Sequence, residues 1–442
     1  MHGFVHLTET ECRVVDHPYF QRLRHIRQND VASFVYPSLN VTRFEHSLGC
    51  CHVAASIAHG LLSTVSEAVR AAYLRQLGFS GAQFEQTCRL YALLHDVGHL
   101  PFSHLFETGL LDFAGSASPN MTAKEVCADW FGPSDFAKPH EAFGYLVAKR
   151  ILDDVEVVEP SVKEAVLKLL GKKTLLDTDP LRPLKLLVDS EVDADRIDST
   201  ARDGWLAGGE YGGYDIERLC SAVRLVQQDE IWGLGFSRKA LSSLEGLLLD
   251  RYRTHTWIHF HHRVVAMKCA FRVLIARLLT DQASTIKDLL VRDGQVANDA
   301  WKFDDVWLSS QLREGSRLWT SEPEASALRA CLHRDISRLH VLWKDRLQWA
   351  GAWNEVMDRA STRLETVDLR NFGRGYETWL DEGFREQPGW AGLRMRIQVL
   401  PFKPLDDNKL FLVEEATNVG RSDLRDASPL CAGLATAWAS AT

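Results

Sequence analysis

The chain has 442 residues, of which 45% are hydrophobic and 25% are charged, and its formal net charge is −8. This composition is typical of a folded globular protein and excludes a chain that is disordered throughout. The negative net charge argues against a protein that coats nucleic acid, although local arginine clusters could still bind a small anion. No apolar stretch approaches the ~20 residues needed to span a bilayer, and the N-terminal residues carry charges where a signal peptide would be apolar. We therefore expect a soluble, cytoplasmic protein.

Most of the chain shows the apolar spacing of α-helices rather than that of strands. Helices are expected over residues 44–62, 85–97, 139–152, 161–170, 185–203, 240–280 and 324–349, with loops near 112–122, 171–183 and 203–215. Short β-rich runs at 394–402 and 409–416 predict a small two-stranded ribbon. The patterns together predict a mainly α protein with a helical core over 1–280, an appended helical lobe over 281–385 and a small mixed α/β element over 386–442.

Cysteine and histidine are used differently in this chain. The nine cysteines include no CxxC pair, and the adjacent Cys50 and Cys51 would form a strained disulfide, so free and mostly buried thiols are expected. The seventeen histidines are more than most soluble chains carry, and many of them fall in clusters.

The densest cluster is YALLHDVGHLPFSHL at residues 91–105, which places His95 beside Asp96 and then adds His99 and His104. Burying ionisable groups without partners costs several kcal/mol each, so something must hold these side chains. A lone His-Asp pair is weak evidence, because the two side chains can simply form a local hydrogen bond. Further clusters of the same residue types on other predicted helices favour a functional site over a local hydrogen bond.

Three further segments carry the same residue types on predicted helices. In NVTRFEHSLG (40–49), Arg43 and His46 are three residues apart and share a helical face. In KPHEAFG, His140 and Glu141 begin another helix. In DSEVDADRIDSTARD (189–203), one helical face collects a mixed set of polar residues, namely Asp195, Ser199, Arg202 and Asp203.

The ordered motifs TRFEHSLG, LLHDVGHLPFSHLFE, HE and DADRIDSTARD resemble those of the HD-domain phosphohydrolases. Within them the chain looks most like the deoxynucleoside triphosphate triphosphohydrolases, which include bacterial dGTPases and the vertebrate SAM-and-HD-domain enzyme. The segments VVDHPYFQRLRHIRQ and DLRDASPLCAGL add to the likeness, which is convincing over roughly residues 14–265. The resemblance implies an HD-domain helical core.

The resemblance also implies a divalent metal ion held by His46, His95, Asp96 and Asp195. Imidazoles and carboxylates suit Mn, Fe, Ni, Co, Zn or Mg, and the sequence does not choose among them. The metal is expected to polarise the α-phosphate and to provide most of the rate acceleration.

The other motif residues are expected around the substrate. We favour His104 as the general acid with Glu107 supporting it, while His99 and His140 lie around the phosphates. By resemblance, Gln28 and Asp203 contact the sugar and Arg196 contacts a phosphate, and Arg43 and Arg202 are further cationic candidates. His259 or Phe260, in the His-rich segment RYRTHTWIHFHHRVV (251–265), is expected to face the sugar or base.

Alternatives stay open for the remaining features. His255, His259 and His262 share one helical stripe, which suits a pocket wall, a packing surface or a second metal site. Ser199 is a candidate substrate-binding residue and stands where the family commonly has Tyr. Asn29 and Asp30 stand where the family has Leu-Gly. Both departures leave open a substrate other than a standard deoxynucleoside triphosphate. Residues matching a regulatory nucleotide site, Asp16, Gln21 and Arg24, suit a structural role equally well.

The sequence therefore predicts metal-dependent hydrolysis of (deoxy)nucleoside triphosphates to nucleoside and triphosphate. One alternative is an HD phosphohydrolase or phosphodiesterase acting on another nucleotide or a nucleic-acid end. Another is a nucleotide-sensing protein with an inactive site. A homo-oligomer and a candidate allosteric nucleotide are expected by analogy, no membrane partner is expected, and nucleic-acid binding stays open.

Overall fold

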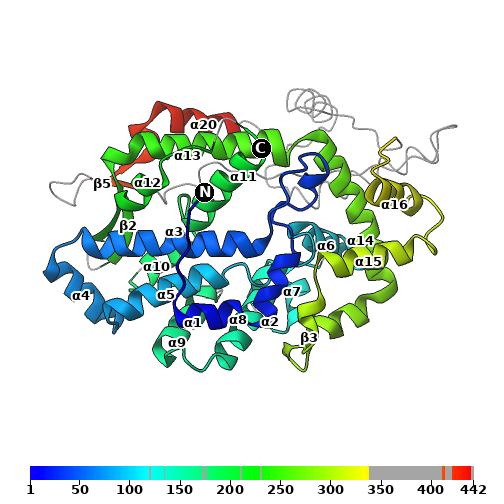
Figure 1. The fold of residues 1–442 in the computed structure, drawn as a ribbon, viewed down its shortest axis with the longest axis horizontal. Coiled ribbons are helices and arrows are strands. Elements are labelled where there is room, and N and C mark those ends of the chain that lie inside the picture. The colour runs from blue at the N-terminus through cyan, green and yellow to red at the C-terminus, as the bar shows by residue number, and fades with distance from the viewer. Residues whose placement is uncertain are drawn as a thin grey trace, which may run out of the picture.

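The computed structural model describes residues 1–118, 121–133, 135–171, 175–176, 178–209, 212–228, 231–337, 411–413 and 421–439. Within these ranges the chain is mainly α, as the sequence predicts (Figure 1). The predicted strand run at 394–402 and the predicted lobe beyond residue 337 lie outside the described residues.

The first half of the chain is a series of helices that includes the long helix α3, against which α5, α11 and α12 pack. In chain order they are α1 (Glu9–Val15), α2 (Pro18–Gln21), η1 (Arg22–His25), η2 (Ala32–Phe34), α3 (Arg43–Ser63), α4 (Glu67–Leu77), α5 (Gly81–Leu94), α6 (His104–Ala117), α7 (Ala123–Phe131), α8 (Pro139–Asp154), α9 (Pro160–Leu170), α10 (Arg182–Leu186), α11 (Ala194–Leu206) and α12 (Ile216–Ala222).

The second half adds longer helices and all of the described strands. They are β1 (Val223–Gln228), β2 (Ile231–Ser237), η3 (Arg238–Ala240), α13 (Leu241–Arg253), the π-helix η4 (Thr254–His259), α14 (His262–Leu290), β3 (Val291–Arg292), β4 (Gln295–Val296), η5 (Ala300–Lys302), α15 (Asp305–Gly315), α16 (Glu324–His333), β5 (Phe411–Val413), β6 (Arg421–Asp423), α19 (Leu424–Ala427) and α20 (Pro429–Ala439). Helix α14 is interrupted at Gln282, whose φ of −139° is not helical, close to the predicted boundary at residue 280.

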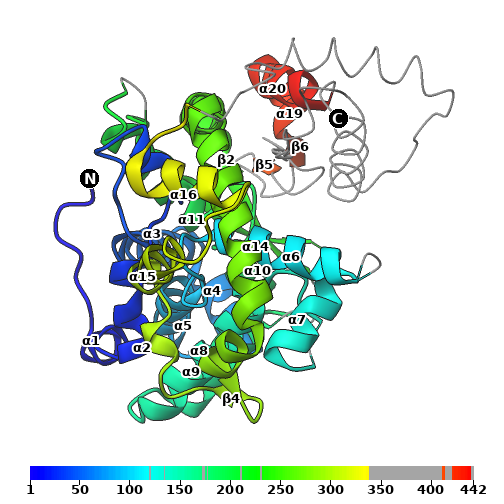
Figure 2. The same cartoon turned by 90° about the vertical axis from the view of Figure 1, so that its right-hand side faces the viewer.

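A small sheet joins the C-terminal element to the helical core. Its strand order is β1-β2-β5-β6, and β5 runs parallel to β2 with Phe236 opposite Leu412. The predicted run at 409–416 therefore contains a strand, and its partners are β2 and β6. The sequence pattern does not indicate the β1–β2 hairpin. In Figure 2, β5, β6, α19 and α20 gather at one end of the molecule.

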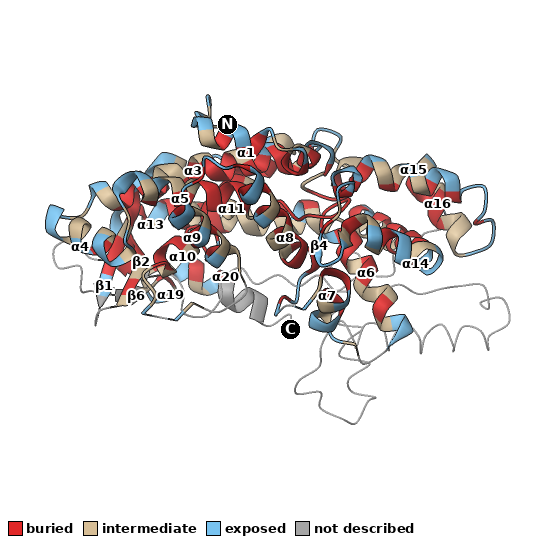
Figure 3. Ribbon diagram, turned by 90° about the horizontal axis from the view of Figure 1, so that it is seen from below, coloured by how far each residue is buried: buried red, intermediate tan, exposed pale blue. Residues whose placement is uncertain are grey.

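Two apolar clusters fill the interior, and α3 and α5 lie between them. Adjacent cysteines show the division, since Cys51 packs into one cluster and Cys50 into the other. Figure 3 shows buried residues along α3 and α11.

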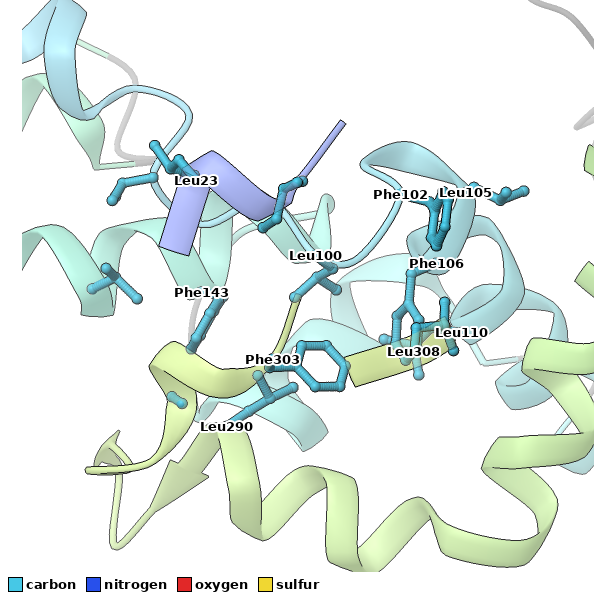
Figure 4. Close-up of a cluster of buried hydrophobic side chains, with 14 of the residues drawn as sticks. Leu23, Leu100, Phe102, Leu105, Phe106, Leu110, Phe143, Leu290, Phe303 and Leu308 are labelled. Atoms are coloured by element: carbon cyan, nitrogen blue, oxygen red, sulfur yellow. The ribbon is translucent and has the colours of Figure 1, made fainter. Parts of the chain in front are cut away.

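The loop that follows α5 is anchored in the first cluster. Leu100 and Phe102 from this loop lie among side chains of η1, α6, α8 and α15 (Figure 4). The rings of Phe106 and Phe303 meet edge to face, with centroids 5.1 Å apart. This packing fixes the backbone that carries His95, Asp96 and His99.

Candidate active site

Four side chains from three helices converge where α3, α5 and α11 meet. His46 comes from α3, His95 and Asp96 directly follow α5, and Asp195 lies in the first turn of α11. His46 Nε2 is 3.0 Å from Asp195 Oδ1 and 3.5 Å from Asp96 Oδ2. His95 Nε2 is 3.4 Å from Asp96 Oδ1 and 4.0 Å from Asp195 Oδ1. The structure thus brings together the four residues predicted as metal ligands.

Both imidazoles are held in the orientation that a metal ligand needs. The ring of His95 donates from Nδ1 to the carbonyl oxygen of Ala92 at 2.7 Å, which leaves a lone pair on Nε2. That Nε2 atom is buried and has no hydrogen-bond partner among the described residues. His46 donates from Nδ1 to Asp198 Oδ2 at 2.8 Å and directs Nε2 at the two carboxylates. Two imidazole nitrogens and two carboxylates fit a divalent transition metal, and the orphaned Nε2 of His95 supports this assignment.

The exposure of the ligands shows from which side a substrate would approach. His46 is fully buried, whereas the Asp195 side chain is 37% exposed. The cluster is therefore open to solvent beside Asp195. Cys50 also borders the centre, with Sγ 3.4 Å from His46 Nε2, and its Sγ lies close enough to His46, His95 and Asp195 to be a further candidate metal ligand.

Asp198 is a residue of this site that the sequence did not single out. Its carboxylate is fully buried and accepts hydrogen bonds from His46, His2 and Arg202. Burial alone would raise the pKa of Asp198, but the bonds from His2, His46 and Arg202 outweigh it and hold the pKa well below the usual range. An ionised carboxylate at this place makes the ring of His46 a better metal ligand. The sequence offered one sign of this role: Asp198 lies three residues after Asp195 and so shares its face of α11.

Gly49 makes the approach of α11 to α3 possible. A Cβ atom at Gly49 would lie 1.8 Å from Asp198 Oδ1 and 2.6 Å from an Arg202 guanidinium nitrogen, far inside contact distance. Only a residue without a side chain lets Asp198 reach His46 across this crossing. Close packing of α11 against α3 therefore explains the glycine at the end of the TRFEHSLG motif.

Arg43 holds Asp96 in place rather than facing open solvent. Its guanidinium is buried, pairs with Asp96 and donates from Nε to Ser103 Oγ at 2.9 Å. Ser103 and the preceding Phe102 both have left-handed backbone, with φ of 54° and 53°. The Asp305 carboxylate accepts from the backbone N–H groups of Phe102 and Arg27 and so secures this strained turn.

A second cluster adjoins the first through His99. His99 Nε2 is 3.3 Å from Asp96 Oδ1, and its ring stacks on that of His140 with centroids 4.3 Å apart. Glu107 Oε2 is 2.9 Å from His140 Nδ1 and 3.5 Å from His104 Nδ1. The predicted catalytic residues His99, His104, Glu107 and His140 therefore form one group. Their ligand atoms lie within 4.8 Å of one another, so the group could also hold a metal ion.

Glu107 is the charged centre of this second cluster. Burial would raise its pKa, but His140 and His104 outweigh burial and hold the pKa of Glu107 well below its usual range. The side chain of His104 is 59% exposed, whereas those of His99 and Glu107 are buried. An exposed imidazole backed by a buried carboxylate is suited to exchange a proton with a bound molecule.

Polar residues also line the region between η1 and the π-helix. Asn29 Nδ2 donates to Asp203 Oδ1 at 2.6 Å, and His259 Nε2 lies 3.7 Å from Asp203 Oδ2. Burial raises the pKa of Asp203 to about 7, although the bond from Asn29 opposes this. Gln28 Oε1 is buried with no hydrogen-bond partner among the described residues. Of these residues, Asn29, Asp203 and His259 lie close together, and Gln28, Asp203 and His259 are the ones predicted at the sugar.

The π-helix corrects one prediction. His255 and His259 do face each other, with ring centroids 5.1 Å apart, and Phe260 packs against His255 at 5.9 Å. His262, however, begins α14 after a break and stacks on His261, so the predicted stripe of His255, His259 and His262 is wrong. The wider turn of a π-helix shifts the phase of the helix, and π-helices often mark functional sites.

The other predicted arginines lie in ion pairs. Arg202 donates twice to Asp198, at 2.8 and 2.9 Å. Arg196 and Arg251 share the buried carboxylate of Glu191, at 3.2 and 3.3 Å. Both arginines also interact with the nearby Asp193, and the sequence did not indicate Arg251. Ser199 is partly exposed on α11.

Asn29 and Asp30, which stand where the family has Leu-Gly, have a local structural explanation. Asp30 has a φ of 50°, the left-handed conformation that a family glycine would adopt without strain. Aspartate tolerates this conformation better than most residues, and Lys268 pairs with its carboxylate at 2.8 Å. Asp30 therefore takes a left-handed backbone conformation that glycine would adopt more easily.

The residues that match a regulatory nucleotide site have structural partners. Gln21 donates to the carbonyl oxygen of Val15 and accepts from Arg24, whose guanidinium lies 3.5 Å from the ring centroid of Phe44. Asp16 caps α1. Each therefore has a local role in the fold.

Among the helices in the described ranges, none is long and apolar enough to cross a membrane.

Comparisons with known proteins agree with this architecture. Residues 43–201 match the family model of the HD domain. An uncharacterized protein of Methanocaldococcus jannaschii is 28% identical over 438 residues, which cover 98% of this chain and 74% of that protein. The "Deoxynucleoside triphosphate triphosphohydrolase SAMHD1 homolog" of Dictyostelium discoideum is 26% identical over 66% of this chain and 50% of its own length.

A further named relative and one solved structure also match the chain. The SAMHD1 protein of Gallus gallus, also named a deoxynucleoside triphosphate triphosphohydrolase, is 23% identical over 76% of this chain and 53% of its own length. The chain thus spans about half the length of these named relatives. A crystal structure of a hypothetical protein from Aquifex aeolicus has the same fold, with a TM-score of 0.63, 22% identity and coverage of 99% of this chain and 96% of that one.

The HD-domain match over residues 43–201 and the clustered metal-ligand types support a metal-dependent phosphohydrolase of the HD-domain type. Within that class, the chain resembles the deoxynucleoside triphosphate triphosphohydrolases.

Proposed function

We propose that the protein hydrolyses deoxynucleoside triphosphates to nucleoside and triphosphate. The observation that carries this proposal is the adjacency of two clusters through Asp96 and His99, whose side chains lie 3.3 Å apart. One cluster has the ligand types for a divalent metal and the other has an exposed histidine backed by a carboxylate. Together they supply the electrophile and the proton donor that cleavage of a phosphate ester needs.

His46, His95, Asp96 and Asp195 would hold the metal ion. When bound, the ion would supply Lewis acidity that polarises a phosphoryl oxygen and activates an attacking water molecule. Arg43 keeps the Asp96 carboxylate oriented, and Asp198 does the same for the His46 ring. Arg196 and Arg251 provide positive charge for the phosphates beyond Asp195.

His104 would protonate the departing 5′ oxygen of the nucleoside. It is the exposed member of the second cluster, and its Nδ1 lies 3.5 Å from Glu107 Oε2. The shorter contact from His140 to Glu107 fixes the carboxylate, while His99 links this group to Asp96. His140 and His99 would thus border the phosphates.

Gln28, Asp203 and His259 would bind the sugar, with Phe260 and Ser199 near the base or sugar. Buried polar groups that lack partners discriminate strongly between ligands that do and do not supply a hydrogen bond. Asn29 beside Asp203 adds a polar group where relatives carry an apolar one. Because Asn29 changes the polarity beside Asp203, hydrolysis of a ribonucleotide or of another phosphorylated substrate at the same site is the second candidate function.

The test is product analysis with metal-free protein to which Mn²⁺ is restored. Deoxynucleotides, ribonucleotides and oligonucleotides are incubated separately and the products are separated by ion-exchange chromatography. Triphosphate released from a deoxynucleotide supports the proposal, whereas phosphate or pyrophosphate contradicts it. Asp96→Ala should abolish metal binding and turnover, while Asp129→Ala, which removes only a surface pair with Lys287, should leave both unchanged.

Turnover of ribonucleotides alone would establish the second candidate. Metal binding without turnover of any substrate would favour a sensing protein. A homo-oligomer and a regulatory nucleotide belong to the same proposal by analogy with the relatives, and size-exclusion chromatography with and without nucleotide tests them.

A further inference from the structure

The N-terminal residues reach the rear of the metal centre. His2 Nε2 lies 2.6 Å from Asp198 Oδ1, and the His2 side chain is only 7% exposed. Its neighbours are open to solvent, since Phe4 is 89% exposed. The start of the chain lies beside α3 and α11 in Figure 1, and the His2 ring is 5.2 Å from that of His52 on α3.

Asp198 receives a full set of donors only with His2 in place. Oδ1 accepts from His2 and Arg202, and Oδ2 accepts from His46 and Arg202. The carboxylate is fully buried, so a lost donor leaves a buried charge less well compensated. The bond from His46 is the one that orients Nε2 toward the metal ligands.

We propose that His2 is a positioning residue for the metal ligand His46, acting through Asp198. The inference rests on the proposed metal centre. His2 fixes Oδ1, Arg202 bridges both oxygens, and Oδ2 is thereby held against the Nδ1–H of His46. His2 also closes the rear of the site to water, which would otherwise compete for Asp198. Residues in this second layer commonly change metal affinity about 10- to 100-fold when they are removed.

The experiment measures Mn²⁺ affinity of full-length, chelator-stripped protein by competition with a fluorescent chelator, without nucleotide. His2→Ala should weaken the affinity about 10-fold. His2→Gln should recover most of it, because its amide nitrogen can replace Nε2 as donor. The matched control is His6→Ala, because His6 is exposed and its backbone oxygen is what accepts from Arg89.

His6→Ala should bind Mn²⁺ like the wild type, and the thermal midpoints of the metal-free variants should agree with one another. Wild-type affinity in His2→Ala, or a glutamine variant as weak as the alanine variant, would overturn the role of His2. His46→Ala separates this failure from that of the metal centre, because unchanged Mn²⁺ affinity there would refute the centre itself. Neither result depends on which nucleotide is hydrolysed.

Discussion

Gly49→Ala tests how the crossing of α3 and α11 supports the site. In an open helix interior this change stabilises a protein by about 1 kcal/mol, because alanine is the better helix former. Here the new Cβ would lie 1.8 Å from Asp198 Oδ1, so Asp198 must move. Lost hydrogen bonding to a charged group costs about 1.5–3 kcal/mol, and overpacking adds about 1–3 kcal/mol.

The variant should therefore be less stable by about 3 kcal/mol in urea unfolding and should bind Mn²⁺ at least about 10-fold more weakly. Gly246→Ala is the matched control. It also lies inside a helix, but its Cβ would meet only Tyr214 at an ordinary 3.6 Å. The control should be neutral or slightly stabilising. If Gly49→Ala behaved like Gly246→Ala in both measurements, the inferred coupling of Asp198 to the metal centre would be wrong.

Three further predictions follow from single contacts. Burial raises the pKa of Asp203 to about 7, so it loses its charge as pH falls; KM for the nucleotide should rise below about pH 7, and Asp203→Asn should flatten the KM–pH profile between pH 5.5 and 8.5, roughly. Gly98→Ala should destabilise by about 3 kcal/mol or more in urea unfolding, because its Cβ would lie 2.1 Å from the backbone nitrogen of Gly144, whereas Gly81→Ala, with open space, should not. Asp30→Ala should lower the unfolding free energy by about 1–2 kcal/mol through its left-handed backbone, and Asp30→Gly should lose less; equal losses would contradict the role assigned to backbone strain.

The helical class followed from the apolar spacing, and the set His46, His95, Asp96 and Asp195 was what the resemblance to HD-domain phosphohydrolases implies. Adjacent ionisable residues in an apolar run require partners, and the motifs on α3 and α11 supplied residues of the right type. The structure brings these side chains together as expected. Their roles stay predictions until the variants are measured.

Other features could not be predicted because they depend on distant contacts. His2 and Asp198 are 196 residues apart, and no local pattern relates them. Arg202 resembled a phosphate ligand in sequence, but the crossing of α11 with α3 places it on Asp198. The π-helix Thr254–His259 shifts the helical phase and so separates His262 from His255, which a regular 3.6-residue spacing cannot anticipate.

The central claim is attack at the α-phosphorus atom of a deoxynucleoside triphosphate at the metal centre. The most direct measurement is hydrolysis in ¹⁸O-labelled water by Mn²⁺-restored protein, with mass spectrometry of both products. The proposal predicts unlabelled nucleoside and triphosphate that carries one ¹⁸O atom, with no turnover by Asp96→Ala. Label in the nucleoside, or release of phosphate or pyrophosphate instead, would contradict it.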